Sequence, residues 1–261
     1  YIDELPEVIK KLQPSMVFCI DQPSEERFRS HSPEMPTNSE VLVEALTDAR
    51  VIKTEDELVC LRKASQVNDA AYERVIRSWK PGMYEYQAKA IFTEVQMSHG
   101  LQQDAYNGIY ASGPNSAILH YVSNTRKTQD GELFLIDAGF EYKGYAADFS
   151  RTFPVNGRFT SDQAAVYDAV LTAQKQVIEA IRPGVRMEDL HMMAARTMME
   201  GLLEMGIIKG SLDDLMEANI FALFFPHGLG HFLGLDTHDV GGYPKGVERI
   251  DRPGIFYLRA R

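Results

Sequence analysis

The strongest constraint on the fold is a pattern of paired amphipathic helices that occurs twice. Residues 80–83, Lys-Pro-Gly-Met, and residues 182–185, Arg-Pro-Gly-Val, lie 102 positions apart. Each stops one helical pattern and is followed by an acidic residue and a second amphipathic pattern. A period this long indicates a duplicated α+β half rather than a solenoid of short repeats.

Capping boxes, Thr-x-x-Glu at 54–57 and Thr-x-x-Gln at 160–163, mark the start of the first helix in each pair. The second helices are expected over 85–98 and 187–205. Strands are expected after each pair, over 106–111, 132–140, 145–154, 221–226 and 230–235. The expected fold class is α+β, with helices packed on one face of a curved, largely antiparallel sheet.

The first fifty residues differ in composition from the rest of the chain. They predict a short helix over 1–11, one strand over 15–20, and a loop or linker over 22–39 that is rich in Pro, Ser and Glu. One strand is too little for a stable domain. We therefore expect residues 1–50 to be the C-terminal remnant of an N-terminal domain plus a linker, and residues 51–261 to form the main domain.

Charge and hydropathy exclude several classes of partner. A formal net charge of −10 argues against nucleic acid, which needs clustered Lys and Arg. No run approaches the ~20 apolar residues of a membrane helix. Two cysteines do not make a disulfide framework in a chain of 261 residues, so a reducing, cytoplasmic setting is expected.

Three polar residues within apolar segments are candidates for a metal-binding site. Asp137 closes the run 133–136, Leu-Phe-Leu-Ile, and Asp148 follows eleven residues later after 144–147, Gly-Tyr-Ala-Ala. On neighbouring strands of a hairpin, two inward carboxylates come within about 5 Å. Such like charges repel unless one is protonated or a cation joins them. A divalent metal shared with His231 would remove the cost of burying them.

The run 227–231, His-Gly-Leu-Gly-His, has the spacing of a helical zinc motif, but two interior glycines disfavour a helix. The alternative to a metal site is an Asx turn at Asp137, a surface position for Asp148 and histidines that are ordinary core residues. Four histidines near expected strand ends favour the metal site, and they are His120, His227, His231 and His238.

These segments resemble the pita-bread metallopeptidases, a family that includes methionine aminopeptidase, aminopeptidase P and prolidase. The resemblance rests on residues 135–139 (LIDAG), 148–153 (DFSRTF) and 226–242 (PHGLGHFLGLDTHDVGG). The segments 115–121 (NSAILHY) and 241–250 (GGYPKGVERI) look most like the eukaryotic-type prolidases of that family. The resemblance implies that residues 51–261 form a partial pita-bread catalytic domain, incomplete at its C-terminus.

The resemblance also implies an activity, a metal site and partners. It implies hydrolysis of Xaa-Pro dipeptides by a water bridging two divalent ions, most simply Mn²⁺ with Zn²⁺ or Co²⁺ as alternatives, in a cytoplasmic homodimer. Asp137, Asp148 and His231 would be metal ligands. The other implied roles are catalytic and substrate-binding for His120 and His238, substrate-binding for Tyr106 and Arg259, and support of the metal ligands for His227.

One departure from the family keeps alternatives open. Two glutamates from C-terminal strands complete the family's site, and no matching segment precedes Arg261. The chain is then either a fragment of an active enzyme or a truncated form with little activity. The competing functions are an Xaa-Pro aminopeptidase of the aminopeptidase P type and a non-catalytic pita-bread module that binds proteins.

Overall fold

The structure is a computed structural model that describes residues 5–19 and 22–241. The chain divides into two compact units, residues 1–54 and 55–261. In the described part of the chain, no helix has both the length and the apolar character needed to cross a membrane.

The first unit is more helical than the sequence predicts. It contains α1 (Leu5–Leu12), α2 (Gln22–His31) and α3 (Ser39–Val51). The predicted strand over 15–20 is wrong within the described residues 15–19, where Val17 makes only an isolated parallel bridge to Thr37. The predicted loop over 22–39 is wrong as well, because most of it is α2.

Local chemistry explains the unexpected helices. Pro23 lies in the first turn of α2, where a missing N–H costs no hydrogen bond. Arg29 bonds Glu25 one turn earlier, with Nη2 2.8 Å from Oε1. Asn38 caps α3 by accepting a hydrogen bond from the Val41 N–H at 3.2 Å.

The second unit contains the two predicted helix pairs. They are α4 (Glu55–Ser78) with α5 (Glu85–Ser98), and α6 (Ser161–Ala180) with α7 (Met187–Glu204), followed by the short α8 (Leu212–Glu217). The capping box at Thr160 and Gln163 forms as predicted. The duplicated helix pairs are therefore confirmed.

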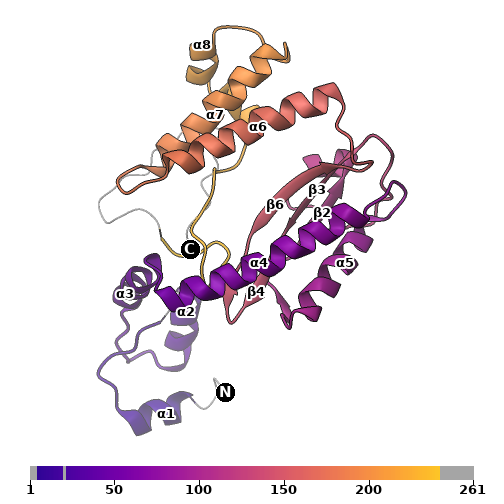
Figure 1. The fold of residues 1–261 in the computed structure, drawn as a ribbon. Coiled ribbons are helices and arrows are strands. Elements are labelled where there is room, and N and C mark those ends of the chain that lie inside the picture. Colours follow the sequence, from indigo (N-terminus) through magenta and orange to yellow (C-terminus); the bar gives the residue numbers. More distant parts are fainter. Residues whose placement is uncertain (1–4, 20–21, 242–261) are drawn as a thin grey trace. The chain divides into compact units, whose positions relative to one another are not determined.

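Two small antiparallel sheets follow the first helix pair. One has the order β2 (Ile109–Ser112), β3 (Leu133–Ala138), β6 (Phe149–Pro154), and the other the order β1 (Gln103–Asp104), β4 (Phe140–Tyr142), β5 (Tyr145–Ala146). In the first sheet Asp137 lies opposite Ile109 on one side and Ser150 on the other. Helices α4 and α5 cover this sheet (Figure 1).

Aromatic packing and buried hydrogen bonds join α4 to the sheet. The rings of Trp79 and Phe134 are 4.6 Å apart. The buried Tyr72 hydroxyl donates to the Ile136 carbonyl at 3.1 Å and accepts from the Ala138 N–H at 3.2 Å. These contacts fix β3, and with it the position of Asp137.

The strands predicted in the second half are wrong within the described residues. Residues 221–226 instead begin in a 3₁₀ helix, η3 (Ile220–Leu223), whose turn continues as the Phe225 N–H donates to the Phe221 carbonyl at 2.8 Å. Residues 230–235 form no strand either. A strand needs a ladder of hydrogen bonds to a neighbouring strand, and in the described part of the chain the one backbone bond from a strand to these segments is from the Ala146 N–H of β5 to the Gly234 carbonyl at 2.9 Å.

We expect Tyr72→Phe to lower the free energy of unfolding by about 1–3 kcal/mol, because it leaves the Ala138 N–H without its buried acceptor. Urea unfolding measures the change. Tyr86→Phe, at an exposed position on α5, is the control. Equal stability of the two variants would contradict the proposed role of the Tyr72 hydroxyl.

Candidate metal centre

One glycine, Gly139, allows the backbone segments that carry the two aspartates to approach closely. Asp137 lies near the end of β3, and Asp148 immediately precedes β6. A Cβ placed on Gly139 would lie 1.7 Å from the carbonyl oxygen of Ala147, so no larger residue fits without moving the backbone. Gly139 therefore fixes the chain at the residue before Asp148.

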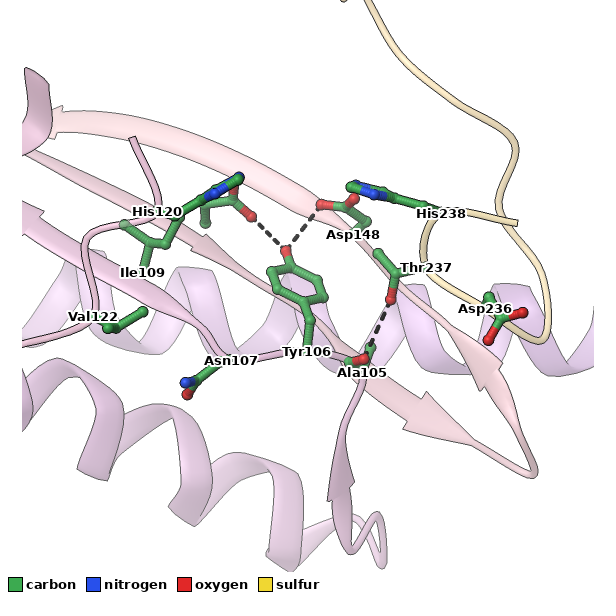
Figure 2. A pocket seen from close by; sticks show the side chains of 11 residues that line it. Ala105, Tyr106, Asn107, Ile109, His120, Val122, Asp148, Asp236, Thr237 and His238 are labelled. Carbon is green, nitrogen blue, oxygen red and sulfur yellow. Dashed lines mark hydrogen bonds between the residues drawn. The ribbon is translucent and has the colours of Figure 1, made fainter. Parts of the chain in front are cut away.

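The Tyr106 hydroxyl joins the two carboxylates. Its oxygen lies 2.5 Å from Asp137 Oδ1 and 2.9 Å from Asp148 Oδ1 (Figure 2). A hydroxyl has one proton, so it satisfies both contacts fully only if one carboxyl group carries a proton itself. The two aspartates therefore meet as the sequence predicts, with a tyrosine between them.

The pKa values of the two aspartates move apart. Burial raises the pKa of Asp137, and the nearby Asp148 charge raises it further, although the Tyr106 hydrogen bond acts against this. Burial also acts to raise the pKa of Asp148, but hydrogen bonds from His231 and Tyr106 outweigh it and leave that pKa lowered. Burial and the two aspartates raise the pKa of the Tyr106 hydroxyl, which keeps it a donor. Asp148 is therefore the more acidic carboxyl group of the pair.

His231 is oriented toward Asp148 by its own backbone. Its Nδ1 lies 2.8 Å from the Phe232 carbonyl oxygen, which can only accept, so Nδ1 carries a hydrogen. Its Nε2 lies 3.0 Å from Asp148 Oδ2. The hydrogen bond to Asp148 raises the pKa of His231. A proton or a metal ion must lie between Nε2 and the carboxylate oxygen.

The donor set fits a divalent metal. Ligand atoms of Asp148, His231 and His238 all lie within 4.8 Å of one another. Imidazole nitrogen with carboxylate oxygen suits Mn²⁺, Zn²⁺ and Co²⁺. The Nδ1–H bond of His231 to a backbone carbonyl is the support that metal-bound histidines usually have. Asp137 reaches this group through Tyr106.

A pocket of about 610 Å³ opens beside these groups. Figure 2 shows His120 and His238 on opposite sides of Tyr106, and both histidines line the pocket. Thr237 Oγ1 donates to the Ala105 carbonyl at 3.3 Å, which connects the segment of His238 to the segment of Tyr106. The structure therefore brings together Tyr106, His120, Asp137, Asp148, His231 and His238.

Two predicted site residues are not part of this group. Arg259 lies outside the described residues, so its role stays a prediction. His227 is exposed, its Nδ1 lies 3.0 Å from the Gly228 carbonyl oxygen, and its ring packs edge-on against Phe225 at 5.1 Å. Its supporting role also stays a prediction.

The sequence analysis missed several residues that line or shape the site. Pocket residues outside the predicted set are Ala105, Asn107, Ile109, Val122, Asp236 and Thr237. Asp236 and Thr237 precede His238 directly, and Val122 lies two residues after His120. Proximity to a predicted histidine could have identified these three. Gly139 was identifiable only from the close approach in the fold.

Known proteins resemble this chain along nearly its whole length. The family model "Metallopeptidase family M24" matches residues 59–255. Human Xaa-Pro dipeptidase is 41% identical over 271 residues, which cover 99% of this chain and 55% of that protein. The chain thus spans about half the length of the curated relatives it matches.

Solved structures agree with this similarity. Proline aminopeptidase P II from Yersinia pestis superposes with a TM-score of 0.86 at 35% identity, covering 97% of this chain and 62% of that one. Six alanine variants of Escherichia coli aminopeptidase P match with TM-scores of 0.83 to 0.86 at 33–35% identity, over 97% of this chain and 61% of theirs.

The fold is that of the pita-bread metallopeptidases. The chain belongs to metallopeptidase family M24, whose members use divalent metal ions. The predicted fold class is therefore confirmed.

We expect Gly139→Ala to destabilise the protein and to weaken metal binding, because the new Cβ pushes the Ala147 carbonyl and Asp148 away from Asp137. A loss of about 1–3 kcal/mol is typical of overpacking at a closed site. Gly230→Ala, with no atom within 4 Å of the added Cβ, is the control for stability. Thermal unfolding in EDTA that is equal for both variants would contradict this role of Gly139.

We expect the metal-free protein to lose stability relative to His231→Gln as pH rises from 6 to 9. The folded-state pKa of His231 is raised, so its contribution is present below the ordinary value and disappears as pH rises through the raised one. Asp148, with a lowered pKa, stays ionised over this range. The stability difference between wild type and His231→Gln is therefore expected to be larger at pH 6 than at pH 9.

Urea unfolding in EDTA at the two pH values measures this difference. His227→Gln, at the exposed histidine of the same run, controls for loss of an imidazole. A difference between wild type and His231→Gln that is constant with pH would show that the His231–Asp148 pair does not stabilise the fold.

Proposed function

We propose that the protein is a metal-dependent hydrolase of Xaa-Pro dipeptides. The observation that carries this proposal is the convergence of Asp137, Asp148 and His231 beside a pocket that His120 and His238 also line. Similarity to human Xaa-Pro dipeptidase over 99% of the chain supports the substrate class.

The metal ligands in this proposal are Asp137, Asp148 and His231, with Asp148 shared between two ions. Spacing along the chain supports this set. The sixth E. coli alanine variant replaces a glutamate, and the other five replace a histidine, two aspartates and two histidines, separated in order by 17, 11, 83 and 7 residues. The same four intervals separate His120, Asp137, Asp148, His231 and His238.

Each residue has a defined task in this proposal. Divalent ions held there would polarise the scissile carbonyl and lower the pKa of the attacking water. Tyr106 holds the two carboxylates in place through its hydroxyl. His238 and His120, which line the pocket on opposite sides of Tyr106, can donate hydrogen bonds to the substrate. Burial and the neighbouring His231 lower the pKa of His238, which favours its neutral form.

The chemistry of proline explains why such a site is specialised. The nitrogen of an Xaa-Pro bond carries no hydrogen, and its ring blocks the usual backbone pairing with a peptidase. Arg259 is proposed to bind the carboxylate of the dipeptide, as an arginine does in a bidentate pair. A site that reads this carboxylate would favour dipeptides over longer peptides.

The second candidate function is an Xaa-Pro aminopeptidase, which removes the first residue of longer peptides. The structures that support it are those of aminopeptidase P from Y. pestis and E. coli. Human Xaa-Pro dipeptidase, at 41% identity, supports the dipeptidase. The two functions differ in the length of peptide accepted.

The proposal also includes the metal, the oligomeric state and the cellular location of the protein. Mn²⁺ is proposed as the metal, with Zn²⁺ and Co²⁺ as alternatives, and a solved E. coli aminopeptidase P described as zinc-substituted supports exchange between ions. A homodimer is proposed from family resemblance. A cytoplasmic location is proposed from the low cysteine content, two in 261 residues, which makes no disulfide framework.

We expect the natural full-length protein to release proline from Ala-Pro with Mn²⁺, and to do so much faster than it cleaves Ala-Pro-Ala. Asp148→Ala should lower the rate at least 100-fold, in the range of a lost catalytic charge, and should lower the metal bound per chain. Preferred cleavage of the tripeptide would favour the aminopeptidase. Metal binding well below two ions per chain with no hydrolysis would indicate a non-catalytic module.

A further inference from the structure

A buried carboxylate lies behind the pocket at the start of α5. Glu85 is completely buried, and the sequence analysis identified it only as the first residue of a helix. Neither the metal ligands nor the pocket lining includes it. A buried carboxylate costs several kcal/mol unless it is paired, so its partners reveal what it holds.

Five donors from four residues converge on the two oxygens of Glu85. Oε1 accepts from Ser112 N–H at 2.8 Å, Ser112 Oγ at 2.8 Å and Asn115 Nδ2 at 3.1 Å. Oε2 accepts from Tyr121 Oη at 2.7 Å and Arg126 N–H at 2.9 Å. All four partners belong to the segment 112–126, which leads from the end of β2 toward β3.

This segment, called here the His120 loop, carries His120 into the pocket. Asn115 and Tyr121 are tied to Glu85 on either side of His120. His120 itself is exposed and has φ +55°, a left-handed conformation that a non-glycine residue adopts only when its surroundings impose it. Its orientation therefore depends on the anchors around it.

Only a carboxylate satisfies this arrangement. Each oxygen of Glu85 accepts a backbone N–H, from Ser112 on one side and from Arg126 on the other. A glutamine would turn its NH₂ group toward one of these N–H groups in either orientation, and two donors cannot bond. Burial acts to raise the pKa of Glu85, but the hydrogen bonds from Tyr121, Ser112 and Arg126 together leave it lowered. The group is therefore anionic at neutral pH.

Residues around Glu85 hold its hydrogen-bond network in place. Arg126 donates from Nη1 to Ser112 Oγ at 3.0 Å and to Glu132 Oε2 at 2.7 Å. Gly113 has φ +51°, and a Cβ there would lie 2.5 Å from Glu132 Oε1. The Glu85 N–H donates to the Arg126 carbonyl at 3.0 Å, which closes a reciprocal pair of bonds between the two residues.

We propose that Glu85 is a positioning residue for substrate binding, which acts by holding the His120 loop so that His120 faces the pocket. This inference rests on the proposed function for its effect on catalysis, whereas its effect on the loop is independent of that function. Glu85 touches neither metal ligands nor pocket, so its loss should leave metal binding unchanged.

The first test measures the loop directly by hydrogen–deuterium exchange of the full-length protein. Glu85→Gln should speed exchange in residues 113–126 and leave β3 and α4 unchanged. Glu94→Gln, at an exposed glutamate of the same helix, is the matched control. Unchanged exchange in the loop, or faster exchange throughout the second unit, would overturn the proposal.

The second test measures coupling to His120 with Ala-Pro as substrate. Glu85→Gln should lower kcat/KM roughly 10- to 100-fold, as expected for a misplaced binding group, with metal affinity within about two-fold of wild type. In a His120→Ala background the same change should add less than about two-fold. Additive losses would show that Glu85 does not act through His120.

A milder variant keeps the test valid if Glu85→Gln does not fold. Tyr121→Phe removes one donor to Glu85 and keeps the buried ring. It should produce the same localised exchange and the same coupling to His120, to a smaller extent. If wild type hydrolyses no Xaa-Pro peptide, the proposed function fails, whereas the exchange result still decides whether Glu85 holds the loop.

Discussion

The close approach of Ala147 to Gly139 is the constraint on which the site depends. It places Asp148 at the end of β3 beside Asp137, where two partly buried carboxylates must share a proton or a cation. Tyr106 and His231 are the polar groups next to these carboxylates. The Tyr106 hydroxyl lies within hydrogen-bond distance of both, and the His231 imidazole faces Asp148. The structure therefore concentrates negative charge at one wall of a pocket and surrounds it with groups suited to hold a metal.

The scaffold behind this wall holds the site residues in position. Tyr72 of α4 and Trp79, the residue that follows this helix, hold β3 in place, and β3 carries Asp137. Helix α5 fixes the His120 loop through Glu85. The two helices of the first pair thus support the two walls of the pocket, one through aromatic packing and a hydroxyl, and the other through a buried ion.

Prediction from the sequence succeeded where the signal lies within a few residues of the predicted feature. Asp137 and Asp148 are carboxylates at the ends of apolar runs, and that contradiction alone predicts a shared partner. The helix pairs follow from capping residues and Pro-Gly stops, which act within a few residues of each boundary. Prediction from the sequence failed over 22–39, where proline and serine predicted a loop although residues 22–31 form α2. It also failed over 221–226, where apolar residues predicted a strand that has no partner strand in the described chain.

The sequence by itself determined the α+β class, both helix pairs, the strand that carries Asp137, the strand that follows Asp148, and the family resemblance. Only the tertiary structure decided that Tyr106 lies between the aspartates, that His238 joins Asp148 and His231, and that Glu85 anchors the His120 loop. The physical reason is the range of the interactions. Capping and periodicity act between near neighbours in the chain. The hydrogen bonds of Glu85 instead span 27 to 41 residues, and the contact of His231 with Asp148 spans 83 residues. These long-range contacts exist only once the sheet and the helices have packed.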